Sequence, residues 1–420
     1  MIKNFSFQKM LLFLFLLSIF FFKIPNFYFL PQIPNSFLTT QSLARAIIFF
    51  LFIIKTAEFI INQKIIFKNA ESRRIVYFCG LLFFLQSISI VEAINMVSFL
   101  NRYKDLIIGL CSLFVFFYFR AKSTRIVTIF LYSVLFNSAL QYLMLFDTTL
   151  FLSIFSPFLY KNYFSLLLAN LDRGRIYVPT FDEITTPFLF IPAFYKNLNQ
   201  KALQIVALVS IIFYALASNI RSSVLVLGVG FLGSLVTFRR NAFSIIVLVM
   251  GGTIIIGYLT NMLLVNFVGF SFYDRLTFQS QAEDVDTVSQ RGEQISQAFS
   301  MANSSLLGVG LGNYYDNVNV TKIDVTLSES RRVEIRNARE YIHNIFATIA
   351  AESGYLSLGI FCVILILFVK QDLANMKGKN SQKKAFIIAF WALFSWGLVN
   401  PPVSGTYQVL FWGIRGLLLV

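Results

Sequence analysis

Long apolar runs recur along the whole chain, and short polar or charged stretches separate them. Most of these runs approach the ~20 residues that an α-helix needs to cross ~30 Å of hydrocarbon. A membrane β-barrel would instead show ~10-residue segments of alternating polarity, and that alternation is absent. The pattern predicts an all-α polytopic membrane protein with about 12 transmembrane helices. The predicted helices cover residues 8–30, 43–61, 75–98, 105–119, 126–146, 183–198, 201–218, 222–238, 242–266, 342–369, 385–400 and 403–420.

The composition agrees with a membrane protein, because 57% of the residues are apolar and only 13% are charged. A water-soluble domain of this size would need more polar residues to cover its surface. Three cysteines lie within apolar runs, far apart and without ligand spacing, so we predict that they are buried apolar residues. They are Cys79, Cys111 and Cys362.

The net charge of +15 would suggest nucleic acid as a partner in a soluble protein, but here the placement of the charges matters more. Connections on one side hold 18 Lys and Arg residues but only two acidic residues. Connections on the other side hold 13 Lys and Arg residues and 15 acidic residues. Short basic loops stay in the cytoplasm. We therefore predict that both termini are cytoplasmic and that the protein binds lipid rather than nucleic acid.

This topology divides the chain into three parts. Residues 1–266 form an N-terminal bundle of about nine transmembrane helices, with an outer excursion at 147–183. Residues 267–341 form an outer loop domain, in which 284–302 and 328–341 have helical patterns. Residues 342–420 contain about three more transmembrane helices. Such a long loop on a compact protein is usually functional or disordered, and its two helical pieces favour an ordered domain.

The only histidine of the chain, His343, stands where this loop meets an apolar helix, in REYIHNIFATIAAESG. An imidazole has an ordinary pKa near 6.5, so it can accept a proton at neutral pH. It could also simply cap the helix. Glu352 follows nine residues later, half a turn out of phase, so it is not expected to pair with His343.

Arginines are the next candidates, because guanidinium stays charged and its fork matches phosphate oxygens. Arg221 lies at the end of an apolar run, where it either binds an anion or extends to the lipid headgroups. Arg291 lies on an amphipathic segment whose apolar edge is Val288, Ile295 and Phe299. A third group shares one helical face, which is either solvated or a platform for an anionic glycan or lipid phosphate. This group is Arg332, Arg336 and Arg339.

Three other patterns have structural interpretations. GVGLGN (308–313) lacks the βαβ context of a dinucleotide site, so we predict a tight turn that lets backbones approach closely. EDVD (283–286) is interpreted as an acidic helix start rather than a metal site. Lys55 and Glu58, at i and i+3, are predicted to pair with each other, and Glu92 could line a cavity.

With these pieces in order, the chain resembles the O-antigen polymerase and O-antigen ligase superfamily. The matching stretches are SNIRSS (218–223), QRGEQISQAFSMANSSLLGVGLGNYY (290–315) and HNIFATIAAESGYLSLGIF (343–361). The resemblance implies a fold like the C-type membrane glycosyltransferases in a bacterial inner membrane. It also implies a glycan donor on undecaprenyl diphosphate at the periplasmic face, and no metal or nucleotide cofactor.

By this resemblance, Arg221 and Arg291 would clamp the diphosphate while His343 faces the acceptor hydroxyl. The chemistry agrees, because a departing diphosphate needs fixed cations and an attacking hydroxyl needs a base. No carboxylate is paired with this set, so we expect direct displacement with inversion. Further substrate contacts are expected from Arg173, Arg175, Arg332, Arg336, Arg339 and Asn344.

Several functions remain open at this point. A polymerase would extend a glycan on its lipid carrier, and the charge-rich outer loop favours it. A ligase would transfer the glycan to a lipid A core sugar, or a relative would transfer it to protein. Both would work with flippase and chain-length regulator proteins. Two alternatives belong to different classes of protein. One is a lipid-linked oligosaccharide flippase or another transporter, and the other is a binding protein without turnover.

Overall fold

The described part of the chain is built of helices. In the computed structural model, the described residues are 7–24, 26–29, 39–61, 69–159, 221–237, 282–318, 342–378, 380–400 and 404–419, with single positions between them. Within these ranges, extended pairing is limited to two isolated bridges, which agrees with the predicted all-α class. The helices are α1 (Phe7–Lys23), α2 (Thr40–Ile61), α3 (Ala70–Ile88), η1 (Ser89–Glu92), α4 (Met96–Phe119), η2 (Arg120–Lys122), α5 (Ser123–Phe146), α6 (Thr148–Phe155), α11 (Arg221–Thr237), α14 (Ala282–Ser304), α15 (Tyr314–Asn317), α17 (Ile345–Lys377), α18 (Ser381–Gly397) and α19 (Gly405–Leu418).

Three continuous helical stretches in the described ranges are long and apolar enough to cross a membrane. They are Ala70–Glu92, Met96–Phe146 and Ile345–Lys377. This finding supports a membrane protein. The number of crossings and the side on which each connection lies stay predictions.

Several predicted boundaries are wrong: the helix expected over 8–30 ends at Lys23, and the one expected over 342–369 continues to Lys377. The largest difference lies between α3 and α4. The helix expected over 75–98 ends at Ile88, and the expected connection at 99–105 lies inside α4, which begins at Met96. Asn95 caps α4 by accepting hydrogen bonds from the backbone N–H groups of Val97 and Ser98. Of the three charges in this stretch, Arg102 and Asp105 form ion pairs with Glu352 of α17 and Arg45 of α2, and Lys104 is exposed.

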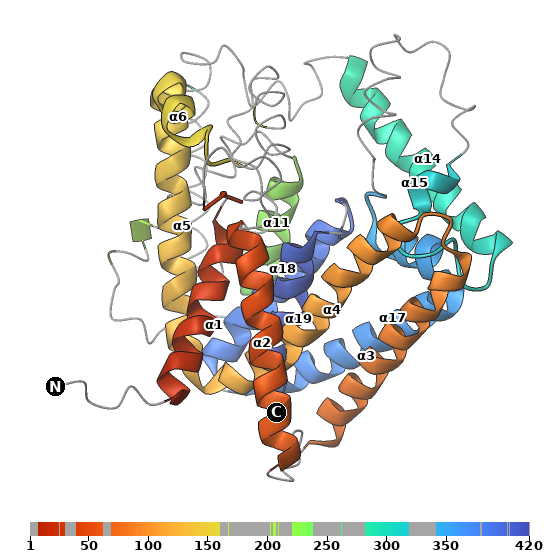
Figure 1. Cartoon of the computed structure of the whole chain (residues 1–420), viewed down its shortest axis with the longest axis horizontal. Coiled ribbons are helices and arrows are strands. Elements are labelled where there is room, and N and C mark those ends of the chain that lie inside the picture. Colours follow the sequence, from red (N-terminus) through yellow and green to blue (C-terminus); the bar gives the residue numbers. More distant parts are fainter. Residues whose placement is uncertain are drawn as a thin grey trace.

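Helix α19 lies at the centre of the molecule (Figure 1) and packs along α4. Every residue from Gly405 to Leu418 is buried. A helix that is covered on all sides is a core element rather than a lipid-facing one. Glycines allow the close contact, since a Cβ at Gly109 would meet Trp412 and a Cβ at Gly416 would meet Leu113.

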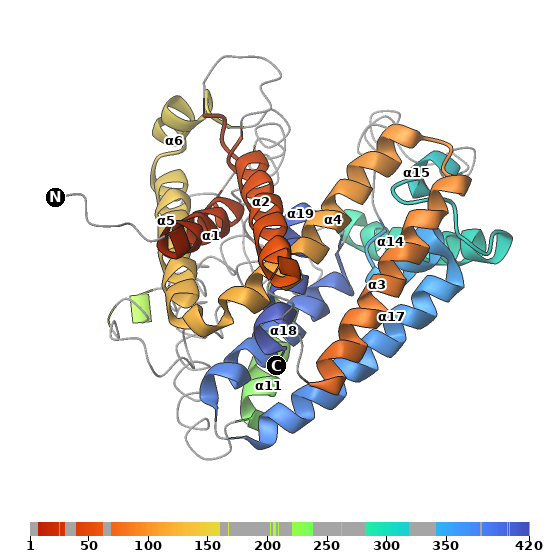
Figure 2. The ribbon, with the colours of Figure 1, turned by 60° about the horizontal axis from the view of Figure 1, so that its bottom comes forward.

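A second group of helices stands beside this core (Figure 2). Helices α3 and α17 lie side by side, and α14 packs against α17. The contact between α14 and α17 has its own small apolar core, formed by Ala298, Tyr314, Ile342, Ala347 and Ala351. The predicted apolar edge of α14 is confirmed in part, because Ile295 and Phe299 pack against this core. The first part of α17 is thus held between α14 and the helix bundle.

Candidate active site

His343 lies directly before α17, and its neighbour Asn344 starts that helix. Asn344 has extended backbone angles, and its side-chain oxygen accepts from the N–H groups of Phe346 and Ala347. Its amide nitrogen donates to the carbonyl of Leu398, at 3.1 Å. The alternative that His343 caps the helix is therefore wrong, because Asn344 does so. The predicted contact of Asn344 with substrate stays a prediction.

The half-buried imidazole of His343 meets the side chain of Gln294 on α14. Its Nδ1 lies 3.1 Å from the Gln294 Oε1. An amide oxygen can only accept a hydrogen bond, so a neutral ring in this contact carries its proton on Nδ1. The lone pair is then on Nε2. The contact orients the ring, and in this tautomer Nε2 is the nitrogen that can act as a base.

The same contact places the helix of Arg291 beside His343. Arg291 lies three residues before Gln294, so the two side chains share one face of α14. Arg291 is half-buried. Further along, the Tyr355 hydroxyl on α17 donates to the Asn303 side chain at 2.8 Å, and its ring stacks on Phe299. Helix α14 is therefore tied to α17 at two points.

The GVGLGN stretch is a turn, as predicted, and it packs on α17. Three of its residues have left-handed backbone angles: Gly308, Gly310 and Gly312, with φ of 72°, 89° and 71°. The N–H of Val309 donates to the carbonyl of Ala351 at 2.8 Å. A Cβ at Gly308 would meet the backbone of Ala351 and Ser353. Only glycine lets these two backbones come so close.

A glycine on the other side of this contact interrupts α17. Gly354 has φ 77° and ψ 172° inside the helix, which marks a kink. A Cβ at this position would meet the carbonyl of Leu306, just before the glycine turn. The kink and the turn therefore fit against each other, backbone to backbone.

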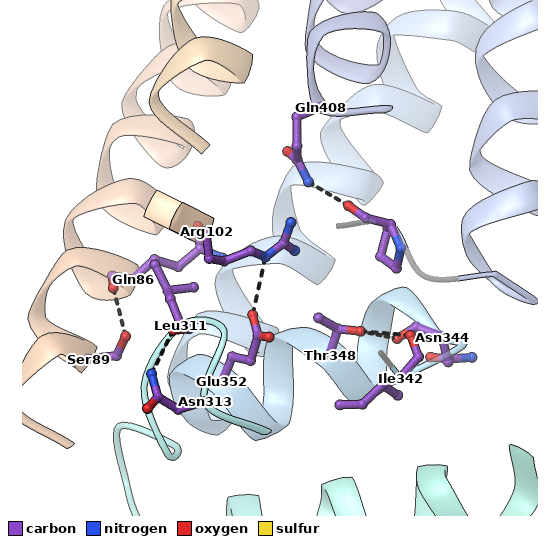
Figure 3. Close-up of polar contacts among 11 residues, drawn as sticks. Gln86, Ser89, Arg102, Leu311, Asn313, Ile342, Asn344, Thr348, Glu352 and Gln408 are labelled. Atoms are coloured by element: carbon purple, nitrogen blue, oxygen red, sulfur yellow. Dashed lines mark hydrogen bonds and ion pairs between the residues drawn. The ribbon is translucent and has the colours of Figure 1, made fainter. Parts of the chain in front are cut away.

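Glu352 lies at this kink and faces α4 (Figure 3). Its carboxylate pairs with the Nε of Arg102 at 3.4 Å; Glu352 is buried and Arg102 is largely buried. This agrees with the expectation that Glu352 does not pair with His343, whose described partner is on α14.

Asn313 closes the turn onto the segment before α4. Its side-chain oxygen accepts from the N–H of Asn95 at 2.6 Å, and its amide nitrogen donates to the carbonyls of Asn95 and Leu311. The side chain is completely buried. The turn is thereby attached to both α4 and α17.

A small cavity of about 30 Å³ lies beside the ion pair, between α3, α4, α17 and α19. Its polar lining comes from Gln86, Arg102, Thr348 and Gln408, and the rest is mostly apolar. Figure 3 shows these side chains around Glu352. A space of this size can hold a water molecule but not a sugar. This cavity is therefore too small to be a sugar-binding site.

The other predicted site residues lie partly or wholly outside the described residues. Arg221 is the first residue of α11, which packs against α18, and its side chain is not described. The structure therefore does not test whether Arg221 joins Arg291 and His343. The remaining arginines, which lie outside the described residues, are Arg173, Arg175, Arg332, Arg336 and Arg339.

Other interpretations of single residues can be compared directly. Lys55 and Glu58 pair at 2.7 Å, as predicted. Cys79 and Cys111 are buried, and Cys362 is half-buried, with all three as free thiols. The EDVD stretch begins α14, as predicted. Glu92 is exposed in η1, and the suggestion that it lines a cavity stays a prediction.

Sequence reasoning missed Gln294, Arg102 and Asn313. Gln294 could have been found, because it lies one helical turn after Arg291 in the stretch that matches the superfamily. The sequence pattern predicts a connection at 99–105, so it does not place Arg102 on a helix. The partner of Asn313 lies 218 residues away, and no local signal marks it.

These features define a class of protein: a helical membrane protein whose one histidine contacts an amphipathic helix. That helix continues into a glycine turn that packs on α17. Residues 206–364 match the family described as O-Antigen ligase. This segment contains Arg221, Arg291, the glycine turn, His343 and Glu352, so it covers the predicted catalytic residues. The match confirms the resemblance to the O-antigen polymerase and ligase superfamily. A search of curated proteins gave no significant match.

Proposed function

We propose that the protein is a membrane glycosyltransferase that extends a surface polysaccharide. It transfers glycan from an undecaprenyl diphosphate donor to a sugar acceptor at the periplasmic face of the inner membrane. The family match supports a polymerase or ligase role in O-antigen biosynthesis. The observation that carries the mechanism is the contact between His343 and Gln294, which orients the base beside the helix of Arg291.

In the proposed reaction, Nε2 of His343 accepts the proton of the attacking sugar hydroxyl. The hydroxyl oxygen forms a bond to the anomeric carbon as the bond from that carbon to the phosphate oxygen breaks, with inversion. The diphosphate leaves with the electron pair, and Arg291 and Arg221 stabilise its charge. A positioned base contributes roughly 10²–10⁴-fold to such a reaction. Guanidinium groups provide the fixed cations that the departing phosphate needs.

The test is the length profile of surface and lipid-linked glycan in cells with His343→Ala. A polymerase predicts single repeat units on the acceptor. Glu293→Gln is the matched control, because this exposed residue adjoins Gln294 and should leave the ladder unchanged. Membrane abundance of each variant must be measured in parallel. An unchanged ladder in His343→Ala would overturn the catalytic assignment.

A ligase is the second candidate, and the description of the matching family favours it. The same side chains would then act on a lipid A core acceptor. In that case His343→Ala leaves full-length chains on undecaprenyl diphosphate and none on the core. The gel therefore separates the two candidates with one variant.

A further inference from the structure

The ion pair of Arg102 and Glu352 joins residues 250 positions apart, and it does so in a buried setting. The two side chains are 11% and 4% exposed. Removing charges from water is costly, so a buried pair is seldom a large net source of stability. It does favour one relative placement of the two helices, since displacement would leave each charge buried alone.

The pair fixes a third element as well. A Cβ at Gly312 would meet Ser98 and Arg102, so the glycine turn packs directly against the part of α4 that carries Arg102. Asn313 adds two hydrogen bonds to Asn95. Helix α4, the glycine turn and the first part of α17 are therefore held together around one carboxylate (Figure 3).

The turn is the continuation of α14, so it also sets where α14 lies. Glu352 is nine residues from His343, roughly 13 Å along the helix at ~1.5 Å per residue, so they do not touch. The link instead runs through the turn and α14 to Gln294, which contacts the ring. A shift of the turn on α17 would move Gln294 away from His343.

We propose that Arg102 and Glu352 are positioning residues for His343. Their ion pair seats the glycine turn on α17 and so places Gln294 within hydrogen-bonding distance of the imidazole. Neither residue contacts the reacting atoms. The predicted effect on glycan transfer rests on the proposed function, but the effect on the imidazole does not.

The lone histidine makes this measurable. ¹⁵N-histidine labelling gives signals from a single imidazole when the purification tag has no histidine. Glu352→Gln should shift the His343 Nδ1 signal and lower glycan transfer about tenfold. Glu352→Asp keeps the charge, so it should shift the signal less and lower the transfer less. Because Glu352→Gln leaves Arg102 buried without its counter-ion, the double variant Arg102→Met/Glu352→Gln is measured too. It removes both charges and should still shift the signal.

The matched control is a similar ion pair at the other end of α17. Arg415 pairs with Asp372 through two contacts of 2.8 and 2.7 Å, and both residues are buried. Arg415→Met/Asp372→Asn removes this pair and should leave the His343 signal in place. The proposal is overturned if both double variants shift the signal alike, or if neither shifts it.

These results are independent of the proposed function. If His343→Ala leaves glycan transfer intact, the catalytic assignment of His343 fails, yet the imidazole signal of the Arg102 and Glu352 variants still reports on positioning. If His343→Ala abolishes transfer while the Arg102 and Glu352 variants leave the signal unchanged, the function stands and the positioning role fails.

Discussion

At the scale of single residues, Gln294 determines which nitrogen of His343 can act as a base. Its oxygen lies 3.1 Å from Nδ1, and the resulting tautomer leaves the lone pair on Nε2. The backbone carbonyl of Gln294 accepts from the Tyr314 hydroxyl at 3.2 Å. The histidine is thus oriented by a residue that is itself anchored.

Gln294→Ala should lower glycan transfer about fivefold to tenfold without removing the base. A net hydrogen bond contributes about 1 kcal/mol, and each 1.4 kcal/mol corresponds to tenfold in rate. The measurement is the initial rate of glycan transfer in membranes, at equal protein abundance. Glu293→Gln serves as the neighbouring control. An unchanged rate in Gln294→Ala would show that the contact does not orient the ring.

At the scale of elements, the kink in α17 and the glycine turn form one joint. A Cβ on Gly354 would clash with the backbone of Leu306, and a Cβ on Gly308 would clash with the backbone of Ala351 and Ser353. The angles of Gly354 belong to a region that is essentially restricted to glycine. The Gly of the ESG stretch and the glycines of the turn therefore serve a single contact.

Gly354→Ala should destabilise the protein by about 1–3 kcal/mol from backbone strain alone, with the clash at Leu306 adding to this. Gly359→Ala is the matched control on the same helix, since its Cβ would meet nothing within 4 Å. Alanine there should instead favour the helix by about 1 kcal/mol. Thermal unfolding in detergent compares the two, and equal stability would contradict the role of the joint.

At the scale of the whole molecule, α19 is the element around which the bundle packs. It is buried along its full length and lies on α4, which also carries Arg102. The interface depends on small residues, as helix contacts in membranes often do. Because α4 reaches both α19 and the glycine turn, the core and the candidate site share one rigid element.

Gly416→Ala should destabilise the bundle, because the added Cβ would meet the Leu113 carbonyl of α4. Overpacking of this kind costs about 1–3 kcal/mol. Gly80→Ala on α3 is the control, as nothing lies within 4 Å of its Cβ. Thermal unfolding measures both variants. Loss of stability in Gly80→Ala alone would contradict this account of the core.

The sequence by itself determined the class of the protein and the place of its candidate chemistry. Apolar runs long enough to span a bilayer can only be satisfied as helices, so the helical membrane class follows from composition and length. The glycine turn and the helix of Arg291 were also predictable, because each depends on local backbone preference and periodicity. The lone His343 stood out by its chemistry alone.

Only the tertiary structure decided what these pieces contact. The turn packs on α17, Glu352 pairs with Arg102, and Gln294 meets His343, each across a long separation in the chain. Local sequence does not specify such partners, because they depend on how helices pack and which charges are buried together. The charges at 102 and 105 even suggested a loop, and only their ion pairs with Glu352 and Arg45 explain why they lie in a helix.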